Sequence, residues 1–235
     1  MRIVSLLPSA TESVYALGLG DHLVGRTHAC DYPDDVVDVP VVTTGHHADT
    51  PEPSLDAELL AKLQPDLVLT DGSEEDPIVD YAEASSVVGR MGRDVTLVAL
   101  APRSIEGILN SVSTVGAFAE AEDEAVGLLE ILRERLGRLE NWILERRLQG
   151  VASRRVVVLE GLDPFLRSGR WVPEMVRRAG GWELLGREGE SSLQTSWDRV
   201  REVEPEVIVL ALDGADAEVA TRTLESSSLP VWFDD

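Results

Sequence analysis

The chain has 235 residues, 43% of them hydrophobic, which is enough for one large α/β domain or for two lobes that each bury a core. Its 43 acidic and 21 basic residues give a formal net charge of −22, so its surface repels nucleic acid phosphates and anionic membranes. The composition therefore predicts no nucleic acid partner. Lys62 is the only lysine, and this Arg-rich acidic balance fits an environment of high salt, where charge repulsion is screened.

The N-terminal residues predict a cytoplasmic chain. Met1 and Arg2 run directly into a strand pattern without an apolar signal core, and no window approaches the roughly 18 apolar residues of a spanning helix. An extracytoplasmic location is the alternative if a leader precedes this sequence. Cys30 is the only cysteine, so an internal disulfide cannot form.

Short β-branched runs alternate with helical patterns along the chain, which predicts parallel sheets wound with helices. The predicted strands are residues 2–7, 22–27, 66–70 and 95–100 in the first half, and 154–161, 206–212 and 230–233 in the second. The first helix is predicted to begin at a capping box formed by Ser9 and Glu12 and to end at Gly18 and Gly20.

Residues 119–150 contain no proline and predict one long amphipathic helix. Its apolar stripe recurs at steps of three and four residues: Val126, Leu129, Leu132, Leu136, Leu139 and Ile143. At about 1.5 Å per residue this helix would extend roughly 40 Å. So long a helix suits a rigid strut between an N-terminal α/β lobe, residues 1–118, and a C-terminal one, residues 151–235. The near-heptad spacing leaves a coiled-coil dimer arm as the alternative.

The turns that follow the predicted strands are the candidate sites, because ligands of open parallel sheets bind beyond the carboxyl ends of strands. These turns are residues 7–11, 27–32, 71–76, 161–171 and 213–216. The first offers backbone N–H groups at a helix N-terminus, which suit an amide or carboxylate of a ligand; a plain helix cap is the alternative.

All four histidines and the single cysteine lie between residues 22 and 47. Imidazole and thiolate bind zinc, cobalt and iron, so His28 and Cys30 are candidate metal ligands, although no spacing matches a closed structural site. His46 and His47 are expected in an exposed loop. A Cys–His nucleophile is a further alternative, but no G-x-S-x-G, phosphate-loop or H-E-x-x-H motif is present. The sequence therefore favours a receptor over an enzyme.

Two tryptophans, Trp171 and Trp197, each precede a predicted helix start, where a rim aromatic ring can stack on a flat ligand. Packing between loop and lobe is the equally weighted alternative.

Four segments together resemble one family. They are residues 2–36, residues 55–72, the long helix and residues 171–181, and they resemble the helical-backbone (class III) substrate-binding proteins of ABC importers, with the cobalamin-binding branch as the nearest. The resemblance spans essentially the whole chain. It implies two Rossmann-like lobes with parallel sheets, one long rigid helix joining them, and a ligand cleft between them, in a family that carries cobalamin, haem or ferric siderophores.

Position by position, the resemblance implies a ligand site made of Ser9, Ala10, His28, Cys30, Asp31, Tyr32, Asp71, Gly72, Trp171 and Trp197. It also implies docking onto an ABC permease through one acidic side chain per lobe, which permease arginines receive in charge-assisted pairs. The matching positions are Glu75 or Asp76 in the first lobe and Asp198 in the second; two of these are aspartates where the matched pattern has glutamate.

We therefore expect a monomeric binding protein for a metal chelate, a corrinoid above all, with no enzymatic activity and no cofactor of its own. The alternatives are a cytoplasmic corrinoid- or metal-handling protein, a Cys/His-dependent enzyme, and an interaction protein assembled through the long helix. The family pattern continues past Asp235 with a further strand and a closing helix, which leaves open whether the second lobe and its pocket wall are complete.

Overall fold

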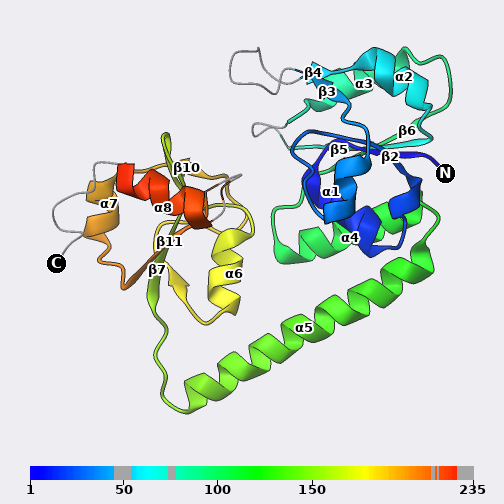
Figure 1. The fold of residues 1–235 in the computed structure, drawn as a ribbon. Helices are drawn as coiled ribbons and strands as arrows, with labels where there is room; N and C mark the ends of the chain where they lie inside the picture. The colour runs from blue at the N-terminus through cyan, green and yellow to red at the C-terminus, as the bar shows by residue number, and fades with distance from the viewer. Residues whose placement is uncertain (45–53, 74–77, 213–214, 216, 227–235) are drawn as a thin grey trace. The chain divides into compact units, whose positions relative to one another are not determined.

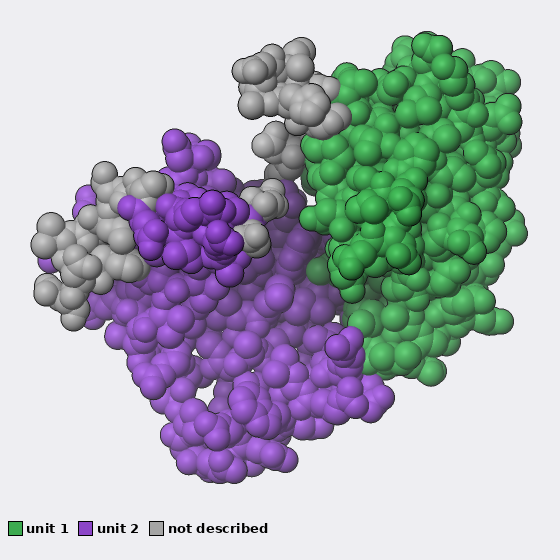
Figure 2. Space-filling model, in the orientation of Figure 1, with its two compact units in different colours: residues 1–101, 107–132 green, residues 102–106, 133–235 purple. Residues whose placement is uncertain are grey.

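The structure is a computed structural model that describes residues 1–44, 54–73, 78–212, 215 and 217–226. The chain divides into two compact units, which Figure 2 colours separately. Unit 1 comprises residues 1–101 and 107–132, and unit 2 comprises residues 102–106 and 133–235. The finer limits of 1–118, 119–150 and 151–235 stay a prediction.

Unit 1 is built on a parallel sheet with the strand order β2-β1-β5-β6. Its strands are β1 (Ile3–Ser5), β2 (Leu23–Arg26), β5 (Leu67–Asp71) and β6 (Thr96–Leu100), and each falls on a predicted strand. The sheet interior is apolar and fully buried at Val4, Val68 and Leu69, as expected for a parallel sheet with covered faces. A short antiparallel pair, β3 (Thr43–Thr44) and β4 (Ser54–Leu55), lies outside this sheet.

The helical elements of unit 1 follow its strands in α/β alternation (Figure 1). They are α1 (Pro8–Ala16), α2 (Ala57–Leu63), α3 (Tyr81–Gly89) and α4 (Ile105–Phe118), with short 3-10 helices at Gly20–His22 and Asp34–Asp38. Leu60 of α2 and Ala84 of α3 pack with the sheet into one core cluster, together with Leu6 and Val79 from the adjoining loops.

The predicted capping box of α1 is wrong. The helix begins at Pro8, whose fixed φ suits the first helical position, and its N-cap is Leu7 with no side-chain cap. Ser9 therefore lies inside the first turn. The predicted end is correct: Gly18 has φ +75, its N–H donates to Tyr15 O at 2.9 Å, and Leu19 N–H donates to Val14 O at 3.0 Å, which together form a Schellman motif.

The long helix is confirmed as α5 (Glu122–Leu148), one uninterrupted helix of 27 residues (Figure 1). Its first turns bury Ala125 and Leu129. Val126, predicted in the stripe, is instead 57% exposed, because Ala125 takes the inward position. Among the described residues, no helix combines the length and apolarity needed to cross a membrane.

Unit 2 has a mixed sheet with the order β10-β8-β7-β11, and β9 pairs with the first residues of β7. The strands are β7 (Arg155–Leu162), β8 (Phe165–Arg167), β9 (Trp182–Glu183), β10 (Leu193–Gln194) and β11 (Val207–Leu210), and the helices are α6 (Val172–Arg178), α7 (Trp197–Glu202) and α8 (Ala217–Ser226). β7 and β11 were predicted and pair in parallel, whereas the antiparallel strands β8 and β10 were not predicted. The predicted strand at 230–233 lies outside the described residues.

Residues 102–106, which comprise part of the loop after β6 and the first two residues of α4, belong to unit 2. The Arg103 Nε donates to Gly189 O at 2.6 Å, and the Ile105 N–H donates to the buried Glu174 carboxylate at 2.8 Å. Arg178 Nε donates to the same carboxylate at 2.9 Å. Burial alone would raise the pKa of Glu174, but these two hydrogen bonds and the arginine charges outweigh it and lower the pKa.

Candidate functional site

The predicted site residues of unit 1 come from turns at one edge of the sheet. β1, β2 and β5 are neighbouring parallel strands, so their carboxyl ends lie at the same edge. Backbone hydrogen bonds continue the pairing into the turns: Leu6 N–H donates to Leu69 O at 2.8 Å, and Gly72 N–H donates to Leu100 O at 3.0 Å. The structure thus brings together the turns that carry Ser9, residues 28–32 and Asp71.

Cys30 is an interior residue of the second turn. Its side chain is only 1% exposed, Thr11 Oγ1 donates to its sulfur at 3.1 Å, and Thr27 Oγ1 lies 3.2 Å from the same sulfur. The thiol therefore fastens the first turn of α1 to the turn after β2. Ala10, fully buried, also points into the interior. Neither side chain is exposed to solvent, so both pack in the interior behind the turns.

His28 is half-buried and faces β3. Its backbone N–H donates to Thr43 Oγ1 at 3.1 Å, and its Nδ1 lies 3.0 Å from the same hydroxyl oxygen. The hydroxyl fixes the ring orientation. Among the described residues, no group of three or more His, Cys, Asp or Glu side chains could hold a metal ion. The predicted site has therefore no protein-built metal centre within that part of the chain.

Arg26 organises the second turn, and the sequence reasoning missed it. The side chain at the end of β2 is only 9% exposed, and its guanidinium donates to four backbone carbonyls. They are Val36 O at 2.8 Å, Thr27 O at 3.1 Å, Cys30 O at 2.9 Å and Val37 O at 3.4 Å. A buried cation thus holds the loop of residues 27–37 in one conformation.

Asp31 and Tyr32 are exposed residues at the centre of this loop. The Tyr32 side chain is 63% exposed, which leaves its ring free to contact a ligand. Asp31 lies near Glu12 of α1: burial raises the pKa of Glu12, and the Asp31 charge raises it further. The loop therefore presents the Tyr32 ring and the Asp31 carboxylate, and the Asp31 carboxylate lies near Glu12 of α1.

The third turn is a tight Asx turn after β5. Ser73 N–H donates to Asp71 Oδ1 at 2.7 Å, so one carboxylate oxygen of Asp71 is committed to its own backbone. Gly72 is exposed, and a Cβ there would lie 3.0 Å from the Ala99 Cβ. The glycine lets this turn pass close to β6.

In unit 2, Trp171 is half-buried at the N-cap of α6. The guanidinium carbon of Arg170 lies 5.9 Å from its ring centroid, a cation–π distance. Arg170 has φ +52, and its backbone pairs with the loop of residues 189–190 through Arg170 N–H to Glu190 O and Gly189 N–H to Arg170 O. Trp171 thus stands on a turn that is held by a second loop.

Trp197 packs into the core of unit 2. It is the first residue of α7, its ring centroid lies 4.7 Å from that of Phe165 at 56°, and it contacts the cluster of Val157, Leu159 and Val200. The packing alternative accounts for this contact.

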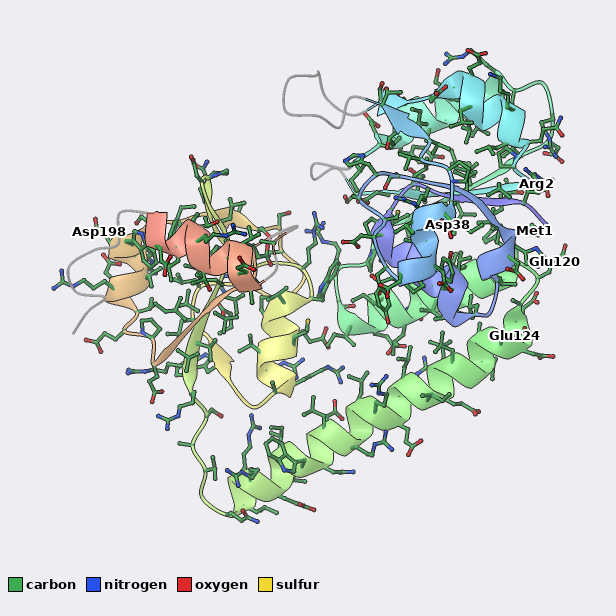
Figure 3. All side chains as sticks on the ribbon, in the orientation of Figure 1. Met1, Arg2, Asp38, Glu120, Glu124 and Asp198 are labelled. Atoms are coloured by element: carbon green, nitrogen blue, oxygen red, sulfur yellow. The ribbon has the colours of Figure 1, made fainter. Side chains whose placement is uncertain are left out.

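Asp198 is exposed in the first turn of α7 (Figure 3). The Ser196 side chain caps this helix by accepting from Arg199 N–H at 3.3 Å. The other predicted docking residues, Glu75 and Asp76, lie outside the described residues, as do His46 and His47.

These features define a class of protein: α/β units on parallel strands, a long connecting helix, and binding turns at the carboxyl ends of strands, as in solute-binding proteins. The chain belongs to the periplasmic binding protein family, whose model matches residues 3–226. The resemblance inferred from the sequence is thereby confirmed.

Curated relatives are named as binding proteins. The chain is 22% identical over 223 residues to the vitamin B12-binding protein of Pectobacterium atrosepticum, covering 93% of this chain and 74% of the relative. It is 33% identical over 135 residues to an uncharacterized ABC transporter substrate-binding lipoprotein of Bacillus subtilis, covering 57% of this chain and 39% of that one.

Solved structures confirm the predicted fold. A periplasmic heme-binding protein from Pseudomonas aeruginosa matches with a TM-score of 0.75 at 22% identity, covering 95% of this chain and 76% of that chain. A periplasmic vitamin B12 binding protein of Vibrio cholerae matches with a TM-score of 0.68 at 21% identity, covering 89% and 75%. The expected two-lobed class III architecture is the one these structures have.

The predicted cytoplasmic location is wrong. The family is that of periplasmic binding proteins, and the relatives are described as periplasmic proteins or as a lipoprotein. The prediction rested on a strand pattern that begins at Ile3, and that pattern is the central strand β1. A core strand reports the fold and carries no information on the compartment.

Proposed function

We propose that this chain is the substrate-binding protein of an ABC-type importer and acts outside the cytoplasmic membrane. Its ligand in this proposal is a metal chelate, a corrinoid above all, with haem and ferric siderophores as the related candidates. The family membership and the vitamin B12- and heme-binding names of the relatives support the proposal. The metal chelate is cargo in this role, so the protein itself requires no cofactor.

One observation carries the proposal: the turns after β1, β2 and β5 share one edge of a sheet, and a buried arginine fixes the largest of them. A rigid loop that presents the exposed Tyr32 ring binds without first losing conformational entropy. In unit 2, Trp171 with its stacked Arg170 offers a second flat surface. Aromatic faces and backbone groups of this kind recognise a large flat ligand.

The proposed role is binding alone. A Cys/His-dependent enzyme would need an accessible thiol beside a base, but the Cys30 sulfur is buried between two threonine hydroxyls, and the His28 Nδ1 faces Thr43. The geometry therefore disfavours that alternative. Docking to permease arginines is proposed at Asp198, which is exposed, and at Glu75 or Asp76.

The test is an absorbance titration of the purified chain with cyanocobalamin, haemin and a ferric hydroxamate siderophore. We expect at least one of them to bind with a Kd below about 10 µM, about −7 kcal/mol. Failure of all three would refute the proposed ligand class.

Matched variants locate the site. Tyr32→Ala and Trp171→Ala should each weaken binding about fivefold or more, since a stacked aromatic contact contributes about 1 kcal/mol or more. The controls are Phe118→Ala in unit 1 and Trp182→Ala in unit 2, two exposed aromatics away from the strand carboxyl ends: Phe118 ends α4, and Trp182 pairs with the first residue of β7. Equal losses in variants and controls would contradict the assignment.

A further inference from the structure

Unit 2 contains a pocket of about 380 Å³ that the proposed transport function does not use. It is lined by the last turns of α5, the following loop, the start of β7, the end of α6 and β11: Trp142, Ile143, Arg146, Arg147, Val151, Ala152, Arg154, Val156, Val176, Ala179, Gly180, Gly181, Val207 and Val209. Val156 and Val207 are at the amino ends of their strands, and Trp171, on the turn that follows β8, is not among the lining residues. The residues that line the pocket are therefore different from those of the proposed ligand site.

The pocket has an apolar interior that is open to solvent. Val207 and Val209 of β11 are each about two-fifths exposed, and Trp142 is 55% exposed. Gly180, with φ +85, passes so close to α5 that a Cβ would lie 3.0 Å from the Ile143 Cδ1. This close approach forms one wall of the pocket. An exposed concave apolar surface of this kind marks a place where another molecule binds.

Three of the lining residues are arginines, so the pocket favours a ligand of negative charge. The guanidinium carbon of Arg146 lies 5.6 Å from the Trp142 ring centroid, and Arg154 forms an ion pair with Glu206 at 2.8 Å. The Arg147 guanidinium has no hydrogen bond or ion pair with the residues that the structure describes. On a chain with a net charge of −22, a cluster of cations at an apolar pocket is complementary to an anion with an apolar body.

We propose that this pocket binds a small amphipathic carboxylate, an aliphatic or aromatic acid. Its apolar body would lie on Val156, Val207 and Val209, and its carboxylate would accept from Arg147. A volume of 380 Å³ is near the lower end for sites of small organic ligands, so a macrocyclic chelate does not fit. The proposal is independent of the transport function, because it uses other residues and another ligand class.

The experiment is calorimetric titration of the full chain with octanoate, and with octanamide as the neutral match of the same length. We expect octanoate to bind with a Kd below about 1 mM and octanamide at least about tenfold more weakly, since an arginine–carboxylate hydrogen bond contributes about one decade of affinity or more. Octanoate should also change the tryptophan fluorescence of the chain, and Trp142→Phe should remove that change.

Two arginines of α5 provide the matched variants. Arg147→Gln should weaken octanoate about tenfold, whereas Arg135→Gln, an exposed arginine of the same helix outside the pocket, should leave it unchanged. Val209→Asp places a carboxylate on the pocket floor and should abolish binding, with circular dichroism to check that the chain is folded. Equal affinity for octanoate and octanamide, equal effects of the two arginine variants, or no binding of octanoate would each overturn the proposal.

Discussion

The strongest test of the site's architecture is Arg26→Met. Methionine keeps the buried stem of the side chain and removes the guanidinium that donates to the carbonyls of Thr27, Cys30, Val36 and Val37. The variant therefore asks whether a buried cation, rather than apolar packing, holds the loop that carries Asp31 and Tyr32.

The expected loss of unfolding free energy depends on which hydrogen bonds each of these carbonyls retains in the variant. Val36 O still accepts from Val39 N–H at 3.0 Å, and Thr27 O still accepts from Cys30 N–H at 3.3 Å, so these two lose only a second hydrogen bond. Cys30 O, at 2.9 Å from the guanidinium, loses its hydrogen-bond donor and stays buried under the loop. An orphaned buried carbonyl costs about 1–3 kcal/mol and each lost second bond about 0.5–1 kcal/mol, so we expect a loss of about 2–5 kcal/mol.

Urea denaturation of both proteins, monitored by circular dichroism, measures this loss from the shift in midpoint at constant m-value. The control is Arg93→Met, which removes a partly exposed ion pair with Asp66 at 2.8 Å and should cost less than about 1 kcal/mol. Arg26→Met should also lower the affinity for the chelate ligand, because the loop no longer holds Tyr32 in position. Equal midpoints for the two variants would refute the reasoning that Arg26 organises the loop.

Three further predictions concern the interior and the charge of the chain. Cys30→Ala should cost about 1–2 kcal/mol in urea, because two threonine hydroxyls lose a partner, yet leave chelate affinity unchanged; a large loss of affinity would restore the thiol as a ligand group. Glu174→Gln should cost about 2 kcal/mol at pH 7. Because the folded pKa of Glu174 is lowered below 4.5, its stabilisation is complete above that pH and is lost as the pH falls through the folded pKa, so the deficit of the variant should shrink in acid; a deficit independent of pH would contradict this sign. Finally, the net charge of −22 predicts a rising urea midpoint from low salt to about 1 M KCl, where the Debye length falls to about 3 Å; an unchanged midpoint would exclude charge repulsion as a determinant of stability.

The elements with a local cause could be predicted from the sequence. β1, β5, β7 and β11 are short apolar runs between turn residues, and α5 is a proline-free stretch with helical periodicity. Because parallel strands place their carboxyl ends at one edge, the turns that carry the candidate site followed from the alternation of strand and helix patterns.

Features that depend on tertiary contacts could not be predicted. Arg26 ends a strand in the sequence, and nothing nearby marks it as buried, because its acceptors extend to Val37, eleven residues later. Cys30 suggested a metal ligand by its spacing from His28, and only its threonine neighbours from two different segments show it to be interior. The sequence pattern fits a capping box at Ser9 as well as it fits a helix start at Pro8. The helix begins at the proline, whose fixed φ suits the first helical position.

Because residues 102–106 belong to unit 2, a fragment that contains only this unit cannot be made by a single truncation of the chain. The chain crosses from one unit to the other at residues 101–102, 106–107 and 132–133, so unit 2 is not one contiguous stretch of polypeptide. A fragment that starts at Arg133 would lack Ile105 N–H, and Glu174 would be left with only its arginine partners. A faithful fragment must therefore include the pentapeptide, for example by circular permutation.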